Sequence, residues 1–357
     1  MKKTILAAVA MFLLASCGGN NKNIEPAETQ PASETQTPTQ TPTQTSAAGG
    51  LNDYFPIPAN TNYHYESAAG DEYTQDVYVT YKNGNLIQRR AASATVLHTE
   101  VIKVENGEAR LIYGDQHFYF YEDITSAEPI LDMLLLKEPL IKGQKWTQDA
   151  LGQCEITGMD IPVTTPAGNF TAMEVTTQFN DGRQPQREYY AKGVGLVKTA
   201  YSASDGGSIE ISLVRIDKNA VLTVPVDFYY PDANEATGFG KEERDININT
   251  NCDLARLLNE QMKTAGSSGY VWLPGNTNIN TIDIDRVNDI IILGFSDNEG
   301  VKTQSGLQSI ADTLGNFYGA DKVRPTVNGA DYHADNKTYG PSDAITANIE
   351  PDPAAVS

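Results

Sequence analysis

The feature that most constrains the fold is an alternation of apolar and polar residues in short runs across residues 54–218. Val77 and Val79, for example, share one parity, and residues of one parity lie on one face of a strand. Asn-Gly pairs at residues 83–84 and 106–107 interrupt the runs. Because Asn and Gly tolerate positive φ, each pair predicts a tight hairpin turn. Several hairpins in series predict a curved antiparallel sheet.

One stretch of this region departs from the alternation. Residues 126–140 are its only candidate for a helix, within limits set by Pro129 and Pro139. Trp146 follows a glycine turn and is expected to be a buried indole at the start of a strand. The sequence therefore predicts a half-barrel-like antiparallel β domain over residues 51–218.

From residue 219 onward the pattern changes to strands that alternate with helices. Leu254, Leu257, Leu258 and Met262 fall on one face of a helix, which Thr250 or Asn251 can cap. This helix is expected to end at Gly266.

A second amphipathic helix follows a continuous apolar run. Leu307, Ile310, Leu314 and Phe317 share one face of this helix, and the run IIILGFS before it is typical of a central strand. An Asn-Gly turn at residues 328–329 belongs to the closing strand. The order β(β)αββαβ predicts an α+β sandwich over residues 219–335, with two helices on one face of a sheet.

Residues 224–332 resemble the sporulation and germination (GerMN) domain of surface proteins of Gram-positive bacteria. The likeness rests on VDFYYPD, LARLLNEQMK, LPGNTNINTIDIDRVNDIIILGFS and the final Val-Asn-Gly. Two details depart from the family pattern: one residue is inserted in its P-x-GT motif, and the GP that often ends its first helix is absent. The resemblance implies a non-enzymatic assembly or scaffold module of the cell envelope.

A second resemblance covers residues 54–215. TPAGNF and, some twenty residues later, YYAKGVGLVK are similar to turns of secreted antiparallel half-barrels in bacterial envelope proteins. Such domains are compared with lipoprotein-carrier sheets that cradle apolar material. A packed core and a lipid pocket are both compatible with this pattern.

The N-terminus reads as a signal peptide at residues 1–16. Two lysines precede an apolar run that is shorter than the roughly 20 residues of a membrane span. Leu14-Ala15-Ser16-Cys17 resembles the lipobox of bacterial lipoproteins. The resemblance implies cleavage between Ser16 and Cys17 and acylation of the Cys17 thiol, with palmitate among the chains. Two acyl chains are enough for stable anchoring, so we expect an extracytoplasmic protein lipid-anchored to the cell membrane.

Residues 17–50 carry the repeat TQTPTQTPTQT and almost nothing apolar. Such a segment cannot bury enough surface to fold, so we expect a disordered stalk between membrane and folded body. Residues 336–357 are expected to form a flexible tail. The formal net charge of −20 repels nucleic acid and argues against it as a partner.

Catalytic and metal-binding motifs are missing from the sequence. Cys154 and Cys252 have no CxxC spacing, and two free thiols are favoured over one disulfide. No nucleophile elbow, metalloprotease or nucleotide-binding motif occurs, so we expect no enzyme, cofactor or metal. Three clusters contain possible metal ligands, but we expect none of them to bind a metal: Asp232, Asn234 and Glu243; Asp283, Asp285 and Asp289; and Asp331, His333 and Asp335.

Two functions remain open on this basis. One is a lipid-anchored envelope scaffold or interaction protein, linked to sporulation, germination or envelope assembly, with envelope proteins or a second copy as partners. The other is a carrier of a small apolar ligand or lipid in the concave sheet. The carrier predicts a sizeable cavity lined by aromatic residues such as Tyr78, Phe118 and Phe120, whereas the scaffold predicts a filled core.

Overall fold

The computed structural model describes residues 49–93, 97–116, 121–148, 151–202, 207–235 and 238–349. None of the helices within these ranges combines the length and the hydropathy that crossing a bilayer requires. The signal peptide, the lipidation site and nearly all of the expected stalk lie outside the described residues.

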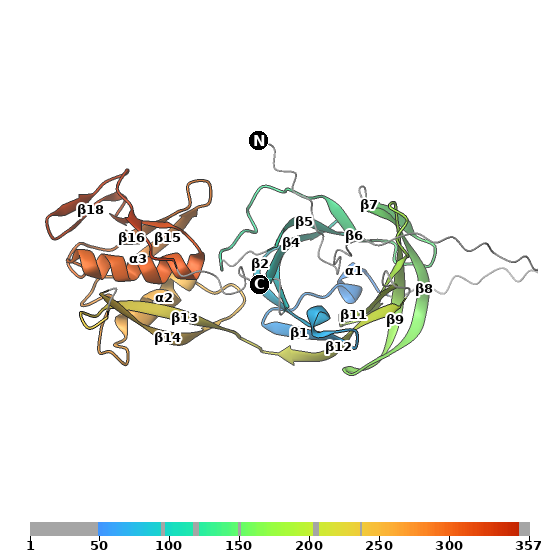
Figure 1. Ribbon diagram of the computed structural model, residues 1–357. Helices are drawn as coiled ribbons and strands as arrows, with labels where there is room; N and C mark the ends of the chain where they lie inside the picture. The colour runs from blue at the N-terminus through green and yellow to red at the C-terminus, as the bar shows by residue number, and fades with distance from the viewer. Residues whose placement is uncertain are drawn as a thin grey trace, which may run out of the picture.

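Most of the first half of the chain forms one antiparallel sheet that curves into a nearly closed barrel (Figure 1). Its strand order is β6-β5-β4-β3-β2-β1-β12-β11-β10-β9-β8-β7. The strands are β1 (Thr61–Ser67), β2 (Gln75–Asn83), β3 (Leu86–Ser93), β4 (Leu97–Glu105), β5 (Glu108–Gln116), β6 (Met133–Lys137), β7 (Lys145–Gln148), β8 (Gly152–Thr165), β9 (Gly168–Phe179), β10 (Gln186–Ala191), β11 (Gly195–Ser202) and β12 (Ser208–Lys218).

The predicted turn residues set the hairpins. Asn106 and Gly107 both have positive φ, 52° and 75°, and connect β4 to β5 through the pair Glu105 and Glu108. A two-residue loop of this kind matches the twist of the strands that it joins. We refer to the described residues of 49–218 as the barrel unit.

Side chains join the two edge strands of the barrel. The Trp146 indole of β7 donates a hydrogen bond to the Leu134 carbonyl oxygen of β6 at 3.0 Å, and the Gln148 side-chain amide donates to the same oxygen at 3.0 Å. Trp146 is buried, as the sequence predicts. These bonds supply part of the pairing that the open edges lack.

The helix expected at residues 126–140 is wrong. Residues 133–137 form edge strand β6, and Leu134, Leu135 and Leu136 are all buried. The flanking prolines block helix extension, and the leucines gain more burial as a strand paired with β5. The barrel unit instead has a 3₁₀ turn, η1 (Asp71–Tyr73), and a short helix that the sequence did not predict, α1 (Leu51–Tyr54), which lies inside the barrel end (Figure 1).

The rest of the chain forms a ribbon, a sheet and two helices, which we call the C-terminal unit (described residues of 222–349). Ribbon β13–β14 is antiparallel, and the sheet has the order β15-β16-β17-β18-β19, with β20 paired to β17. The elements are β13 (Leu222–Pro231), β14 (Phe239–Ile248), α2 (Leu254–Lys263), β15 (Ile279–Asp285), β16 (Ile290–Phe295), α3 (Gln304–Tyr318), β17 (Lys322–Val327), β18 (Ala330–Ala334), β19 (Lys337–Tyr339) and β20 (Ile345–Thr346).

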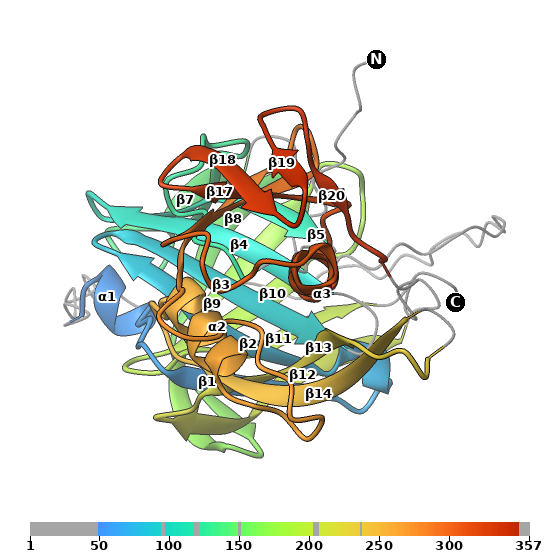
Figure 2. The same cartoon turned by 90° about the vertical axis from the view of Figure 1, so that its left-hand side faces the viewer.

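The predicted order ββαββαβ is confirmed from β13 to β17. Strand β16 is central, antiparallel to β15 and parallel to β17. Helix α3 lies between the sheet and the ribbon (Figures 1 and 2), and none of its residues after Ser305 is exposed. The fold class is therefore confirmed: mostly β, with a curved antiparallel sheet followed by an α+β unit.

The expected cap of α2 is wrong, although its apolar face is confirmed. Asp253 is the N-cap and accepts from the Arg256 backbone N–H, and the helix ends at Lys263 rather than at Gly266. Thr250 and Asn251 cannot cap α2 because their side chains bond to the barrel unit instead.

The flexible tail expected from residue 336 is wrong for residues 337–346, which contain β19 and β20. Tyr339 and Ile345 are buried in the core of the C-terminal unit. A side chain at Gly315 of α3 would collide with Ala347, so the chain after β20 packs tightly on that helix. Residues 350–357 lie outside the described ranges.

Candidate functional site in the barrel interior

Charged side chains are buried inside the barrel. Arg89 of β3 and Glu100 of β4 are register partners, and the Arg89 Nε donates to the Glu100 carboxylate at 2.5 Å. Directly paired residues of neighbouring strands point to the same face, so both side chains enter the interior. The Glu100 side chain is only 2% exposed.

His98 lies two residues before Glu100 and so faces the same side. Its Nε2 is 3.6 Å from the Glu100 Oε1, and it is 4% exposed. Within the described ranges neither ring nitrogen has a hydrogen-bond partner. Burial disfavours the Glu100 charge, but Arg89 and His98 outweigh that cost and hold the pKa of Glu100 below its usual value.

A second buried carboxyl group belongs to β10. Glu188 accepts hydrogen bonds from the Tyr190 hydroxyl at 3.2 Å and from the Gln186 side-chain amide at 3.3 Å. Burial raises the pKa of Glu188 to about 7, against the smaller opposing effects of these bonds and of Arg89. Near neutral pH this group therefore titrates, whereas Glu100 is ionised.

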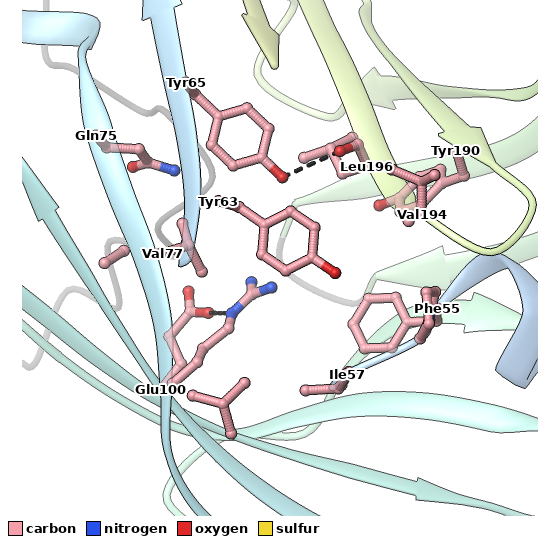
Figure 3. A pocket seen from close by; sticks show the side chains of 15 residues that line it. Phe55, Ile57, Tyr63, Tyr65, Gln75, Val77, Glu100, Tyr190, Val194 and Leu196 are labelled. Carbon is pink, nitrogen blue, oxygen red and sulfur yellow. Dashed lines mark hydrogen bonds and ion pairs between the residues drawn. The ribbon is translucent and has the colours of Figure 1, made fainter. Parts of the chain in front are cut away.

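A cavity of about 70 Å³ adjoins the Arg89–Glu100 pair. Its buried floor includes Tyr65, Val79 and Tyr190, and its rim consists of half-buried residues such as Tyr63 and Val194. Figure 3 shows aromatic and aliphatic side chains from opposite walls of the barrel around this space, with the Tyr65 hydroxyl bonded to the Leu196 carbonyl oxygen at 3.0 Å. The cavity is thus mainly apolar, with one ion pair at its wall.

The segment after α1 separates this cavity from a surface groove. Phe55, Pro56 and Ile57 line both spaces, and the groove measures about 570 Å³. Several bonds hold the segment: the Leu51 N–H donates to Glu138 at 2.6 Å, the Gly193 N–H to the Asp53 carbonyl oxygen at 2.6 Å, and the Lys82 ammonium group to the Ile57 carbonyl oxygen at 3.1 Å. Residues 51–58 therefore act as a plug at this end of the barrel.

The predicted aromatic lining is wrong for Tyr78. Its side chain faces the C-terminal unit, where its hydroxyl lies 3.2 Å from the Ala220 carbonyl oxygen and 3.3 Å from that of Ile248. Strand alternation puts Tyr78 on the opposite face to Val77 and Val79, which do line the cavity. Phe118 and Phe120 lie outside the described residues, as do Ser16 and Cys17.

The other sequence candidates lie apart from this cavity. Cys154 and Cys252 are free, as favoured; the first is buried in β8 and the second half-buried before α2. No group of three potential ligands able to hold a metal occurs among the described residues.

The acidic candidates serve local structure instead. Asp232 accepts from Asn234, Asp285 bonds to Asn288, and Asp335 accepts from the Gln304 N–H at the start of α3. His333 bonds to Thr338 on the neighbouring strand β19.

The buried polar residues of the barrel were not predicted from the sequence. Arg89 shares its parity with the buried Ile87, and Glu100 shares its parity with the buried Ile102. Strand alternation therefore indicated that both charged side chains face the interior. Charged residues of the opposite parity, such as Arg90, obscured it.

Residues 227–333 match the family model of Germane, which is described as sporulation and spore germination. Among curated proteins, none matches the chain. Solved structures that are similar to parts of the chain include the tandem GerMN domains of the sporulation protein GerM from Bacillus subtilis, with 17% identity and a TM-score of 0.29 over 37% of this chain and 47% of that one.

Two further structures are similar to a different share of the chain. A Bacteroides fragilis protein described as exported, with a YmcC-like fold, has 15% identity and a TM-score of 0.29, covering 46% of this chain and 98% of that one. A Parabacteroides distasonis protein described as a lipoprotein has 16% identity and a TM-score of 0.27, with the same two coverages. The similarity to the Germane family thus lies within the C-terminal unit, at residues 227–333.

Proposed function

We propose that this chain is an envelope protein, lipid-anchored outside the cell membrane, that holds partner proteins through its Germane domain and performs no catalysis. The lipobox-like sequence at Leu14–Cys17 supports the anchor, and the family match supports a link to sporulation, germination or envelope assembly. The partners are other envelope proteins or a second copy of the chain.

The observation that carries this proposal is the hydrogen-bonded junction between the two units. The Lys82 N–H donates to the Asn251 side chain at 2.7 Å, and the Asn251 side-chain amide returns a bond to the Lys82 carbonyl oxygen at 3.0 Å. Arg286 donates to Glu122 at 2.7 Å, and the Tyr121 and Phe317 rings stack with centroids 5.4 Å apart. A scaffold needs such fixed geometry, because it must present the Germane domain in one orientation.

The interior of the barrel supports a scaffold over a lipid carrier. Pockets for drug-sized ligands occupy about 300–1,000 Å³, whereas the interior cavity measures about 70 Å³. The remaining interior is filled by the buried apolar clusters and by the plug.

Crosslinking in intact cells tests the proposal. A photoreactive amino acid replaces Val287, which is 93% exposed on the turn between β15 and β16, and a control variant carries it at Ile130, 50% exposed on the barrel unit. We expect protein adducts at position 287 that are absent at position 130, identified by mass spectrometry.

Adducts between two copies would identify the chain itself as the partner. Absence of adducts at position 287, together with a monomeric native mass of the full chain in detergent, would overturn the scaffold function.

A further inference from the structure

The interior cavity contains hydrogen-bond donors that the protein leaves available. A guanidinium group carries five N–H donors, and within the described ranges Arg89 forms one side-chain hydrogen bond, from Nε to Glu100. Its terminal nitrogens are not among the buried atoms without a partner, although the side chain is only 19% exposed. The terminal N–H groups of Arg89 therefore reach open space at the cavity wall.

The rim adds a second available donor. The Tyr63 side chain lines the cavity with its hydroxyl directed into it (Figure 3). In the part of the chain that the structure describes, no residue forms a hydrogen bond with this hydroxyl, in contrast to the Tyr65 hydroxyl, which bonds to Leu196. Gln75 also lines the cavity and supplies a side-chain amide.

The charge balance limits what these donors can bind. Glu100 already compensates the Arg89 charge at 2.5 Å, so the ion pair is neutral as a whole. An anion placed here would be a buried charge without a counterion, which is costly. An uncharged acceptor such as a carbonyl oxygen adds hydrogen bonds without adding charge.

The cavity walls determine the polarity of the rest of the ligand. Phe55, Ile57, Val77 and Val194 present apolar surface around the donors. A volume of about 70 Å³ holds only a few non-hydrogen atoms. The other atoms of a larger ligand must lie between the half-buried residues of the rim.

We propose that this cavity is a binding site for a small uncharged molecule with a carbonyl group at the end of a short apolar chain. The carbonyl oxygen accepts from the Arg89 terminal N–H groups and the Tyr63 hydroxyl, and the chain leaves through the rim. This site goes beyond the scaffold function, which does not require it.

The test uses the full chain in detergent and two probes of equal size. Ligand-observed NMR titrations compare 2-pentanone, which is uncharged, with butyrate, which is anionic. We expect saturable binding of 2-pentanone and at least tenfold weaker binding of butyrate. Equal or tighter binding of butyrate would overturn the charge argument, and no saturable binding of 2-pentanone would overturn the site.

Two variants locate the binding. Tyr63→Phe removes only the hydroxyl, and we expect about fivefold weaker binding of 2-pentanone, the loss of one neutral hydrogen bond. Val77→Phe fills the space and is expected to abolish binding while circular dichroism confirms the fold. Tyr230→Phe, in the C-terminal unit, is the matched control and should bind as the parent does. Unchanged binding in both Tyr63→Phe and Val77→Phe would show that the cavity is not the site.

Discussion

Asn60 and Thr250, 190 residues apart, exchange two hydrogen bonds across the junction between the units. The Asn60 N–H donates to the Thr250 hydroxyl oxygen at 2.8 Å, and the Thr250 N–H donates to the Asn60 side-chain oxygen at 2.8 Å. The Thr250 hydroxyl then donates to the Val79 carbonyl oxygen at 2.7 Å. One threonine side chain thus serves as both acceptor and donor between the barrel unit and the C-terminal unit.

Replacing Thr250 with valine should weaken the junction. Valine keeps the shape of threonine but leaves the Asn60 N–H and the Val79 carbonyl oxygen without their partner, at a cost of about 1–3 kcal/mol. Calorimetry should show the unfolding transitions of the two units moving apart. Thr223→Val is the control, because Thr223 bonds to Asn247 on the exposed face of the ribbon; equal effects of the two substitutions would contradict a special role for Thr250.

Glu188 should make stability depend on pH near neutrality. Burial raises its pKa to about 7 from an ordinary value near 4.5, so the folded state holds a proton that the unfolded state releases. The stabilisation is complete below about pH 4.5 and is lost as the pH rises to about 7 and above. We expect Glu188→Gln to flatten this dependence and to raise stability at pH 8 by about 2–4 kcal/mol. Denaturant titrations at several pH values measure the free energy of unfolding of the parent and of Glu188→Gln. If stability depended on pH equally in the two proteins, Glu188 would not be the group that titrates.

The Arg89–Glu100 pair should respond in the opposite direction. The pKa of Glu100 is lowered, so its contribution is present above the unfolded value near 4.5 and is lost as the pH falls below that value. Glu100→Gln leaves Arg89 buried without a counterion and should cost about 3–5 kcal/mol. The double variant Arg89→Met with Glu100→Leu should recover most of that loss. A double variant as unstable as the single one would argue that the pair itself stabilises the barrel.

Trp146→Phe tests the barrel seam. Phenylalanine keeps much of the buried apolar surface but loses the donor to the Leu134 carbonyl oxygen. We expect the free energy of unfolding to fall by about 1 kcal/mol. This is at the lower end of the cost for a buried hydrogen bond, because Gln148 still donates to the same oxygen. The variant Trp146→Phe with Gln148→Ala should lose more than the sum of the two single changes, as measured by chemical denaturation; strict additivity would mean that the two donors act independently.

Cys17→Ser tests the anchor. The variant cannot carry the acyl chains that the lipobox-like sequence predicts, and about 0.8 kcal/mol of membrane binding is lost for each buried methylene. We expect the protein to leave the membrane fraction and its intact mass to lack the acyl groups. Retention of the variant in membranes with an unchanged mass would exclude lipidation at Cys17.

Local patterns predicted much of the fold. Alternation around Val77 and the turn at Asn106 and Gly107 depend on residues close in sequence, as does the apolar face of α3 at Leu307 and Ile310. The stretch around Leu135 failed because consecutive leucines fit a helix and a strand buried on both faces equally well. Only pairing with β5 decides between them.

The interior site was not predictable in the same way. Arg89 and Glu100 are paired across the neighbouring strands β3 and β4, whereas Glu188 lies on β10, which only barrel closure brings near Arg89. A single charged residue in a strand is normally solvated, so each one alone predicted a surface position. The plug was not predicted either, because the four residues from Leu51 to Tyr54 are too few to show the periodicity of a helix.

The position of α3 restricts which surfaces of the C-terminal unit another protein can contact. Because no residue of α3 after Ser305 is exposed, most of this helix is inaccessible to another protein. In a deep mutational scan its residues should tolerate substitution as poorly as those of central strand β16, and selection for binding should leave α3 unchanged. Any contact with a partner must instead use the outer face of the sheet, its loops, the ribbon, or the exposed side of α2 that carries Arg256 and Glu260.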